Sequence, residues 1–117
     1  MKKIILMNEA KEIIKEICEG YGIGFTDYGR EIDMYTGTEK SEDVATFGVI
    51  YNMMMNESNE ENASVYDISF NGRVRSMPSD MTSEDLREFA NRCTVVANAI
   101  DDMNEELKDV LVKVEEV

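Results

Sequence analysis

The sequence predicts an α+β fold: an N-terminal helix, a three- to four-stranded antiparallel sheet in meander order, and a long C-terminal helix packed on one face of that sheet. Two observations predict it. Apolar residues recur at helical spacing near both ends of the chain, whereas apolar and polar residues alternate in its middle. A chain of 117 residues is long enough for one hydrophobic core and too short for two, so we expect a single domain over residues 1–117.

The first helix is predicted between Asn8, a suitable N-cap, and Gly20, which suits the position after the last turn. Its charged residues lie opposite an apolar stripe, as in a helix that covers a core. The apolar residues before Asn8 fit either a backward extension of the helix, which we favour, or a short strand; they are Ile4, Ile5 and Met7. The stripe itself consists of Ala10, Ile13, Ile14, Ile17 and Cys18.

The middle of the chain has the alternation of strands. Residues 25–35 are β-like, and the polar segment 36–43 that follows predicts a turn. Residues 45–55 carry apolar side chains on both faces, which predicts a central strand covered on both sides. Residues 56–62 include no apolar side chain, so we expect an exposed acidic loop there.

A hairpin is predicted around Asn71-Gly72, because this pair supplies the two positive φ angles of a type I′ turn at low cost. The strand before the turn presents Tyr66, Ile68 and Phe70 on one face. Pro78 then closes the sheet region.

The C-terminal helix is predicted over about residues 83–116, after a capping pair formed by Thr82 and Asp85. Its apolar residues keep a seven-residue step, and a helix of this length would measure about 50 Å. It must therefore either overhang the domain or break near Asp101 and Asp102, and the sequence supports both. In an overhanging helix the apolar stripe would dimerise or pack on the first helix; its residues are Ile100, Met103, Leu107, Val110, Leu111 and Val114.

Charge is the most unusual bulk property of the chain. It has 25 acidic and 12 basic residues, a formal net charge of −13. The first 19 residues are balanced, so the whole excess lies after them. Such a field repels nucleic acid and anionic membranes and steers basic partners toward the protein, although solubility alone is the plain explanation of the same fact.

Histidine is absent, which removes the commonest general base, the usual catalytic triads and the usual zinc sites. Asp33 and Asp67, each within a predicted strand, are the carboxylates left for acid–base chemistry, but their alternation predicts that both are solvated. The acidic runs lack the calcium-loop pattern. Arg73 and Arg75 could hold an anion or pair with Asp67 across the hairpin. We therefore expect no enzyme, cofactor or metal.

Cys18 and Cys93 lie on the apolar sides of predicted helices, where a thiol usually acts as a small buried hydrophobe; a disulfide or a reactive thiol is the alternative. The chain has neither an apolar run of transmembrane length nor a signal-peptide pattern at Met1. These features predict a cytoplasmic protein, in the host cytoplasm if it is phage-encoded.

The first functional hypothesis is a binding inhibitor whose carboxylates mimic the nucleic-acid backbone and occupy the basic groove of a nucleic-acid-binding protein. Small size, one sheet with helices, no catalytic set and excess acid on exposed elements resemble phage-encoded anti-CRISPR and anti-restriction proteins as a class. That resemblance rests on composition and architecture and transfers no functional residue. The candidate contacts, taken from the exposed loop and the last helix, are Glu57, Glu60, Glu61, Asp101, Asp102, Glu105, Glu106 and Asp109.

Two further hypotheses come from other classes. In the second, the chain is a dimeric adaptor or chaperone-like protein, and the stripe of the C-terminal helix pairs with a second copy or receives a partner helix. In the third, it is a small-ligand binder or an enzyme that uses Asp33 or Asp67. A tight dimer insensitive to salt would favour the adaptor, whereas salt-sensitive binding of basic proteins would favour the mimic.

Overall fold

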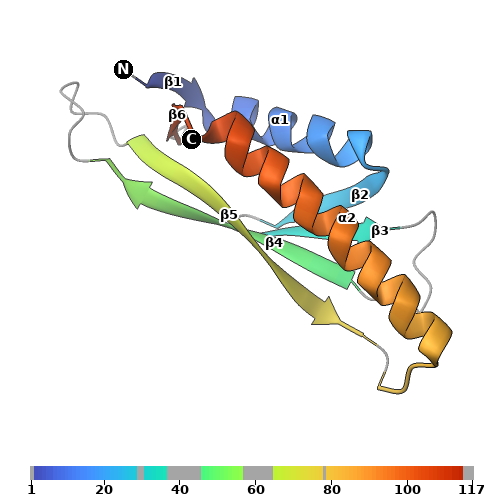
Figure 1. Ribbon diagram of the computed structural model, residues 1–117. Coiled ribbons are helices and arrows are strands. Elements are labelled where there is room, and N and C mark those ends of the chain that lie inside the picture. Colours follow the sequence, from blue (N-terminus) through green and yellow to red (C-terminus); the bar gives the residue numbers. More distant parts are fainter. Residues whose placement is uncertain (1, 29–30, 37–45, 57–64, 78, 115–117) are drawn as a thin grey trace.

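The predicted α+β fold is confirmed by a computed structural model, which describes residues 2–28, 31–36, 46–56, 65–77 and 79–114. Both helices lie on the same face of one sheet (Figure 1). The elements, in chain order, are β1 (Lys3–Leu6), α1 (Met7–Gly20), β2 (Ile23–Tyr28), β3 (Glu31–Thr36), β4 (Thr46–Met55), β5 (Val65–Ser76), α2 (Ser83–Leu107) and β6 (Val110–Lys113). None of the helices in this part of the chain is long and apolar enough to cross a lipid bilayer.

The sheet contains four antiparallel strands in sequential order, as predicted, and two more strands. The four are divided differently from the prediction, because the β-like region 25–35 falls in two strands, β2 and β3, and the predicted hairpin around Asn71-Gly72 is one strand, β5. The order of the sheet is β1-β6-β5-β4-β3-β2, and the pairs from β2 to β6 are antiparallel. The added strands come from the two ends of the described chain, and β1 pairs with β6 in parallel. The sheet is therefore mixed, and the terminal strands extend it beyond β5.

The favoured backward extension of the first helix was wrong, because the residues before Met7 form β1. The N-cap position belongs to Leu6, whose side chain makes no capping hydrogen bond, and Asn8 lies inside the helix. Ile5 is buried on the inner face of β1, next to Val112 of β6. β-Branched residues on both segments suit a strand pair.

The C-terminal helix is shorter than predicted. α2 ends at Leu107, beyond the break proposed near Asp101 and Asp102. Of the apolar residues that continued its heptad pattern, Val110 belongs to β6 and Val114 directly follows it. A helix of 25 residues is about 38 Å long. Because the molecule extends 55 Å along its longest axis, α2 has no need to overhang. The predicted capping pair is confirmed: Thr82 Oγ1 accepts from the Asp85 amide, and the Thr82 amide donates to Asp85 Oδ2, both at 3.1 Å.

The predicted hairpin was wrong, because β5 runs straight through Asn71-Gly72 and pairs with β4 along almost its whole length. Among the described glycines, only Gly22 has the positive φ that a type I′ turn requires. Gly72 serves a different purpose: a Cβ atom built there would lie 2.7 Å from Cδ1 of Ile100. The glycine thus allows α2 to cross close to β5, a recognised use of glycine inside a strand.

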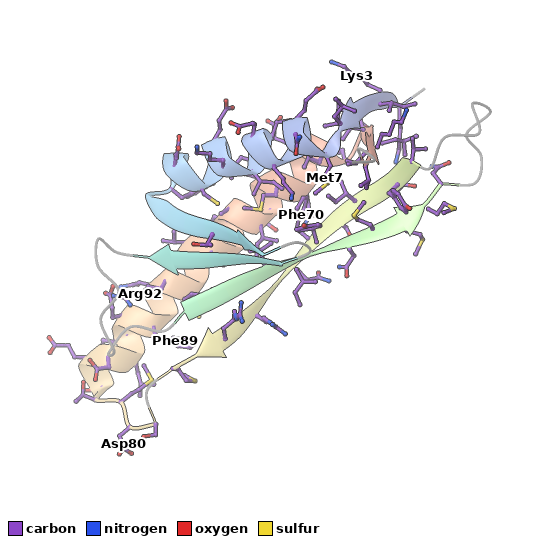
Figure 2. All side chains as sticks on the ribbon, turned by 180° about the vertical axis from the view of Figure 1, so that it is seen from behind. Lys3, Met7, Phe70, Asp80, Phe89 and Arg92 are labelled. Atoms are coloured by element: carbon purple, nitrogen blue, oxygen red, sulfur yellow. The ribbon has the colours of Figure 1, made fainter. Side chains whose placement is uncertain are left out.

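The core lies between the sheet and the two helices. Alternate residues of β4 and β5 point into it, and Phe70 of β5 is 2% exposed (Figure 2). At the N-terminal end of α2, the ring of Phe89 stacks on Phe47 with centroids 5.9 Å apart. The helices contribute Ala10, Ile14 and Cys18 of α1 and Val96, Ala99, Met103 and Leu107 of α2 to the same core.

Candidate binding surfaces

The end of α2 carries a dense group of exposed carboxylates. We call Asp101, Asp102, Glu105, Glu106 and Asp109 the acidic cluster; all five are exposed. One basic residue, Lys108, lies among them in the sequence, and its Nζ is 2.6 Å from Oε1 of Glu105. The hydrogen bond and charge of that carboxylate raise the pKa of Lys108. The cluster keeps a strongly negative balance after this pairing.

Helical geometry explains why the cluster lies on one surface. Met103 and Leu107 are buried against the sheet, with 0% and 1% exposure. Asp101, Asp102, Glu105 and Glu106 lie on the opposite side of the helix, because the helix turns by about 100° per residue. Packing of the two buried side chains holds the backbone of this turn, so the acidic cluster is presented from a fixed scaffold.

One member of the acidic cluster also joins the two helices. The hydroxyl of Tyr21, just after α1, donates to Oδ2 of Asp102 at 2.5 Å. This hydrogen bond, followed by desolvation and by the charges of Asp102 and Asp101, raises the pKa of Tyr21. The bond connects the surface of α1 to that of α2 at the acidic cluster.

The other three predicted acidic contacts, Glu57, Glu60 and Glu61, lie outside the described residues. Asp33 lies in β3, where its backbone is opposite Gly48 of β4.

Asp67 forms an ion pair that ties the N-terminus to β5. Its Oδ1 lies 2.7 Å from Nζ of Lys2, and its Oδ2 accepts from Nδ2 of Asn56 at 3.0 Å. The hydrogen bond from Lys2 lowers the pKa of this carboxyl. Arg73 and Arg75 lie on the same strand as Asp67, so the predicted cross-strand pairing with it was wrong.

The residues predicted for dimerisation or helix packing are largely covered by the chain itself. Ile100, Met103 and Leu107 of α2 face the sheet. Val110 of β6 packs on the same core, and Leu111 of β6 is also buried. Met103, Leu107 and Leu111 are buried, Ile100 and Val110 are half-buried, and Val114 is 46% exposed. Within the described chain, the stripe is therefore mostly occupied by intramolecular packing.

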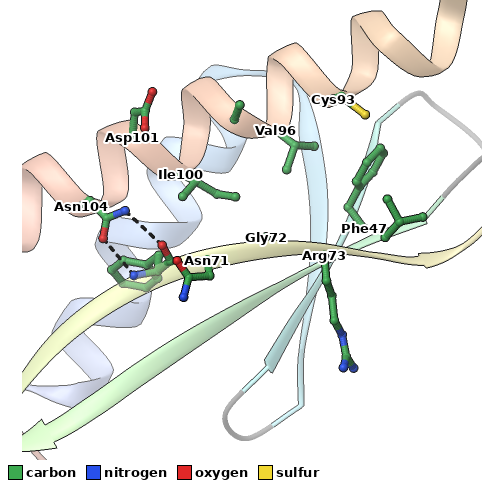
Figure 3. Close-up of a pocket in the computed structure, with 12 residues that line it drawn as sticks. Phe47, Asn71, Gly72, Arg73, Cys93, Val96, Ile100, Asp101 and Asn104 are labelled. Carbon is green, nitrogen blue, oxygen red and sulfur yellow. Dashed lines mark hydrogen bonds between the residues drawn. The ribbon is translucent and has the colours of Figure 1, made fainter.

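A groove that the sequence did not reveal lies between α2 and the C-terminal half of β5 (Figure 3). Its volume is about 560 Å³. Apolar side chains of Phe47, Val96 and Ile100 line it, and Asp101 and Asn104 add polar groups. Gly72 was the one signal in the sequence, because a glycine inside an alternating strand marks a bulge or a close approach of another backbone.

Asn104 closes one end of this groove. Its Oδ1 accepts from the Phe70 amide at 2.9 Å, and its Nδ2 donates to the Phe70 carbonyl at 3.1 Å (Figure 3). One side-chain amide thus replaces the strand that would otherwise pair with Phe70. The main chain of β5 and the end of α2 are locked together at this point.

The two cysteines are free thiols in different surroundings. Cys18 is fully buried, and desolvation, with a smaller effect of Glu19, raises its pKa to about 11. Cys93 is half-buried and lines the groove. Across the residues that the structure describes, no group of three or more Cys, Asp or Glu side chains is placed to hold a metal ion.

Comparison with known proteins gives no further assignment: no family model, no curated protein and no solved structure matches this chain.

Proposed function

We propose that this chain is a small protein-binding inhibitor, whose acidic cluster occupies the basic groove of a nucleic-acid-binding protein in the cytoplasm. This is the mode of action of a nucleic-acid mimic of the anti-CRISPR or anti-restriction type. It requires no catalytic residue and no cofactor. The observation that carries the proposal is the position of the acidic cluster at the C-terminal end of α2.

Acidic residues are unfavourable at this position. The C-terminal end of a helix carries partial negative charge, which favours cations, and the last turn of α2 contains no basic residue. Asp101 and Glu105 are four residues apart, as are Asp102 and Glu106, and like charges at this spacing cost about 0.2–0.5 kcal/mol a pair. Solubility alone could be achieved with acids anywhere on the surface. Their concentration at an unfavourable site supports a binding function.

The charge density also suits a phosphate mimic. Four carboxylates lie within the six residues from Asp101 to Glu106, which span about 7.5 Å of helix axis. This gives about one charge per 2 Å, near the value of about one per 1.7 Å for duplex DNA. A groove that attracts the nucleic-acid backbone would attract this surface by the same electrostatic interaction.

The test begins with a pull-down from a lysate, with the purified protein as bait and washes at low and high salt. Mass spectrometry then identifies the retained proteins. We expect a nucleic-acid-binding protein that duplex DNA and high salt both displace. A partner that is retained regardless of salt and of added DNA would contradict the mimic.

A pair of charge-matched variants tests the surface itself. The first replaces four acids of the acidic cluster by their amides: Asp101→Asn, Asp102→Asn, Glu105→Gln and Glu106→Gln. The control changes the net charge equally, on exposed positions of α1: Glu9→Gln, Glu12→Gln, Glu16→Gln and Glu19→Gln. We expect the cluster variant to bind the captured partner at least tenfold more weakly and the control to bind within about twofold of the parent.

The two variants separate a defined surface from a general effect of net charge. Equal losses in both would show that only the overall charge attracts the partner, and full binding by the cluster variant would refute the proposed contact. Stability gives an independent readout. Removing two like-charge pairs and the unfavourable dipole interaction favours the cluster variant, whereas losing the Lys108–Glu105 ion pair and the charge of the Asp102 acceptor of Tyr21 offsets part of that gain, so the variant should be at least as stable as the parent. The α1 control also removes an acid near a helix C-terminus, Glu19, but it removes only one like-charge pair at a spacing of four residues, Glu12 and Glu16, and it loses the favourable Glu9 in the first turn, so it should gain less.

A further inference from the structure

The edge of β5 that faces away from β4 is open along its C-terminal half. Among the described strands, β6 pairs only with Val65 and Tyr66 at the other end of β5. The Asn56 amide donates to the Val65 carbonyl at 2.9 Å, so odd-numbered residues of β5 direct their backbone groups to β4. Even-numbered residues therefore direct theirs to the open edge.

The hydrogen bonds of Phe70 agree with this assignment, since both its backbone groups bond to Asn104 of α2 and not to β4. The next two even-numbered residues are Gly72 and Val74. The alternation along β5 directs their N–H and C=O groups into the space between β5 and α2, and no described strand pairs with β5 on that side at these residues. Both residues line the groove.

The groove has the form of a site for one extended strand. An exposed sheet edge supplies main-chain hydrogen bonds to an added strand, while the neighbouring apolar surface accepts alternate side chains. Here β5 supplies the edge. Val96 and Ile100 of α2 and Phe47 of β4 supply the neighbouring apolar surface. The volume of about 560 Å³ lies within the usual range for binding sites.

The charge around the groove indicates which kind of added strand would bind there. The chain carries a net charge of −13, and Asp101 lines the groove. The side chain of Arg73 extends from β5 away from α2 (Figure 3). A second copy of the chain would bring the same negative charge, and its own α2 would have to fit beside the same edge. A peptide with basic and apolar residues in alternation meets neither obstacle.

We propose that the groove between β5 and α2 binds an extended, basic peptide segment of a partner protein, which adds a strand to β5 at Gly72 and Val74. This inference goes beyond the proposed function, because it uses backbone groups of β5 and can hold whether or not the acidic cluster mimics nucleic acid. Apolar side chains of the peptide would face the apolar surface of the groove, and its basic side chains would face solvent and the surrounding negative field.

The test uses a labelled Lys-Val-Lys-Val-Lys-Val peptide as the probe and a Glu-Val-Glu-Val-Glu-Val peptide as its charge control. We expect the lysine probe to shift the backbone amide resonances of Gly72 and Val74 and to slow their hydrogen exchange at least tenfold. We expect the glutamate peptide to bind at least tenfold more weakly. Unchanged Gly72 and Val74 amides at saturating lysine probe, or equal binding of the two peptides, would overturn the proposal.

Val74→Pro tests the backbone contact directly. Proline removes the amide donor at the open edge. Val74 lies opposite Phe47 of β4, but the alternation along β5 directs its backbone groups away from β4. Val74→Ala is the matched control, since it shortens the same side chain and keeps the donor. We expect the proline variant to bind the lysine probe at least tenfold more weakly than the alanine variant. Equal affinities would overturn the proposal.

A second pair of variants covers the case in which Val74→Pro does not fold. Ala97→Trp fills the groove from an exposed position of α2, and Asn91→Trp places the same side chain on α2 outside the groove. We expect only the first to abolish probe binding, and equal binding by both would overturn the proposal. If the parent protein dimerises through the β5 edge in the absence of probe and the Ala97→Trp variant is monomeric, the groove binds a second copy instead.

Discussion

Replacing Asn104 by alanine should destabilise the protein by about 1.5 kcal/mol. The substitution removes two hydrogen bonds, of 2.9 and 3.1 Å, and leaves the Phe70 N–H and C=O groups without these partners. Each bond contributes about 1 kcal/mol net, which gives a loss of about 2 kcal/mol. Alanine regains about 0.5 kcal/mol through its higher helix propensity.

This free energy is large enough to measure. With an unfolding entropy of about 2.1 cal/mol/K per residue, a chain of 117 residues changes its Tm by about 4 °C for each kcal/mol. Asn104→Ala should therefore lower the Tm by about 6 °C. Urea unfolding followed by circular dichroism should show a lower midpoint with an unchanged m value.

Asn98→Ala is the matched control, because Asn98 is exposed on the same helix and outside the groove. It should gain helix propensity and lose no bond to β5, so its stability should rise slightly. If Asn104→Ala proved as stable as Asn98→Ala, the bridge between α2 and β5 would contribute nothing, and the account of how the edge of β5 is closed at Phe70 would be refuted.

Three further predictions concern single sites. Gly72→Ala should cost at most about 1 kcal/mol in thermal unfolding, because its Cβ would lie 2.7 Å from Cδ1 of Ile100, the flexible end of that side chain, while alanine is favoured over glycine in a strand; Ile100→Val in the same chain removes Cδ1 and should recover part of any loss. Asp67→Asn should cost less than about 1 kcal/mol at pH 7, since the ion pair with Lys2 is exposed; the folded pKa of Asp67 is lowered, so its contribution is present above the unfolded pKa and should vanish as an acid titration passes below the folded one. Cys18, buried and with a pKa of about 11, should react with a thiol reagent at pH 8 only at the rate of unfolding.

Each of these has a result that contradicts it. An additive effect of the changes at Gly72 and Ile100 would mean that the two side chains do not meet. A stability difference between Asp67→Asn and the parent that persists at pH 2 would assign the effect to something other than the carboxylate. Rapid labelling of Cys18 under native conditions, before any unfolding, would show that α1 opens locally.

The helices and the central strands follow from periodicity, which is a local property of the sequence. The stripe of α1, the capping pair of Thr82 and Asp85, and the alternation in β4 each report a burial pattern that the fold keeps. The terminal strands could not be predicted this way. β1 is a four-residue segment whose partner, β6, lies more than a hundred residues later, so its state depends on a long-range pairing that no local window contains.

The Asn71-Gly72 pair shows how tertiary contacts override a strong local signal. A type I′ turn would have satisfied the local preference, but β4 offers a partner strand of ten residues that continues past this point. Because the strand continues, more of its backbone groups pair with β4, and α2 can pack close to Gly72. The sequence signal for a turn and the structural use for close packing require the same residue, glycine, for different reasons.

The two proposed surfaces share a physical origin in the end of α2. Met103, Leu107 and Asn104 fix this segment to the sheet, through burial and through the two bonds to Phe70. That attachment offsets the unfavourable charges of the acidic cluster at the helix terminus and also sets the width of the groove along β5. One side of this segment packs firmly on the sheet, and the other side carries destabilising charge. This arrangement is expected at a binding surface whose charges lower the stability of the fold. Solubility alone does not require carboxylates at this terminus, and the first turn of α2, where the helix dipole favours acids, already carries Glu84 and Asp85.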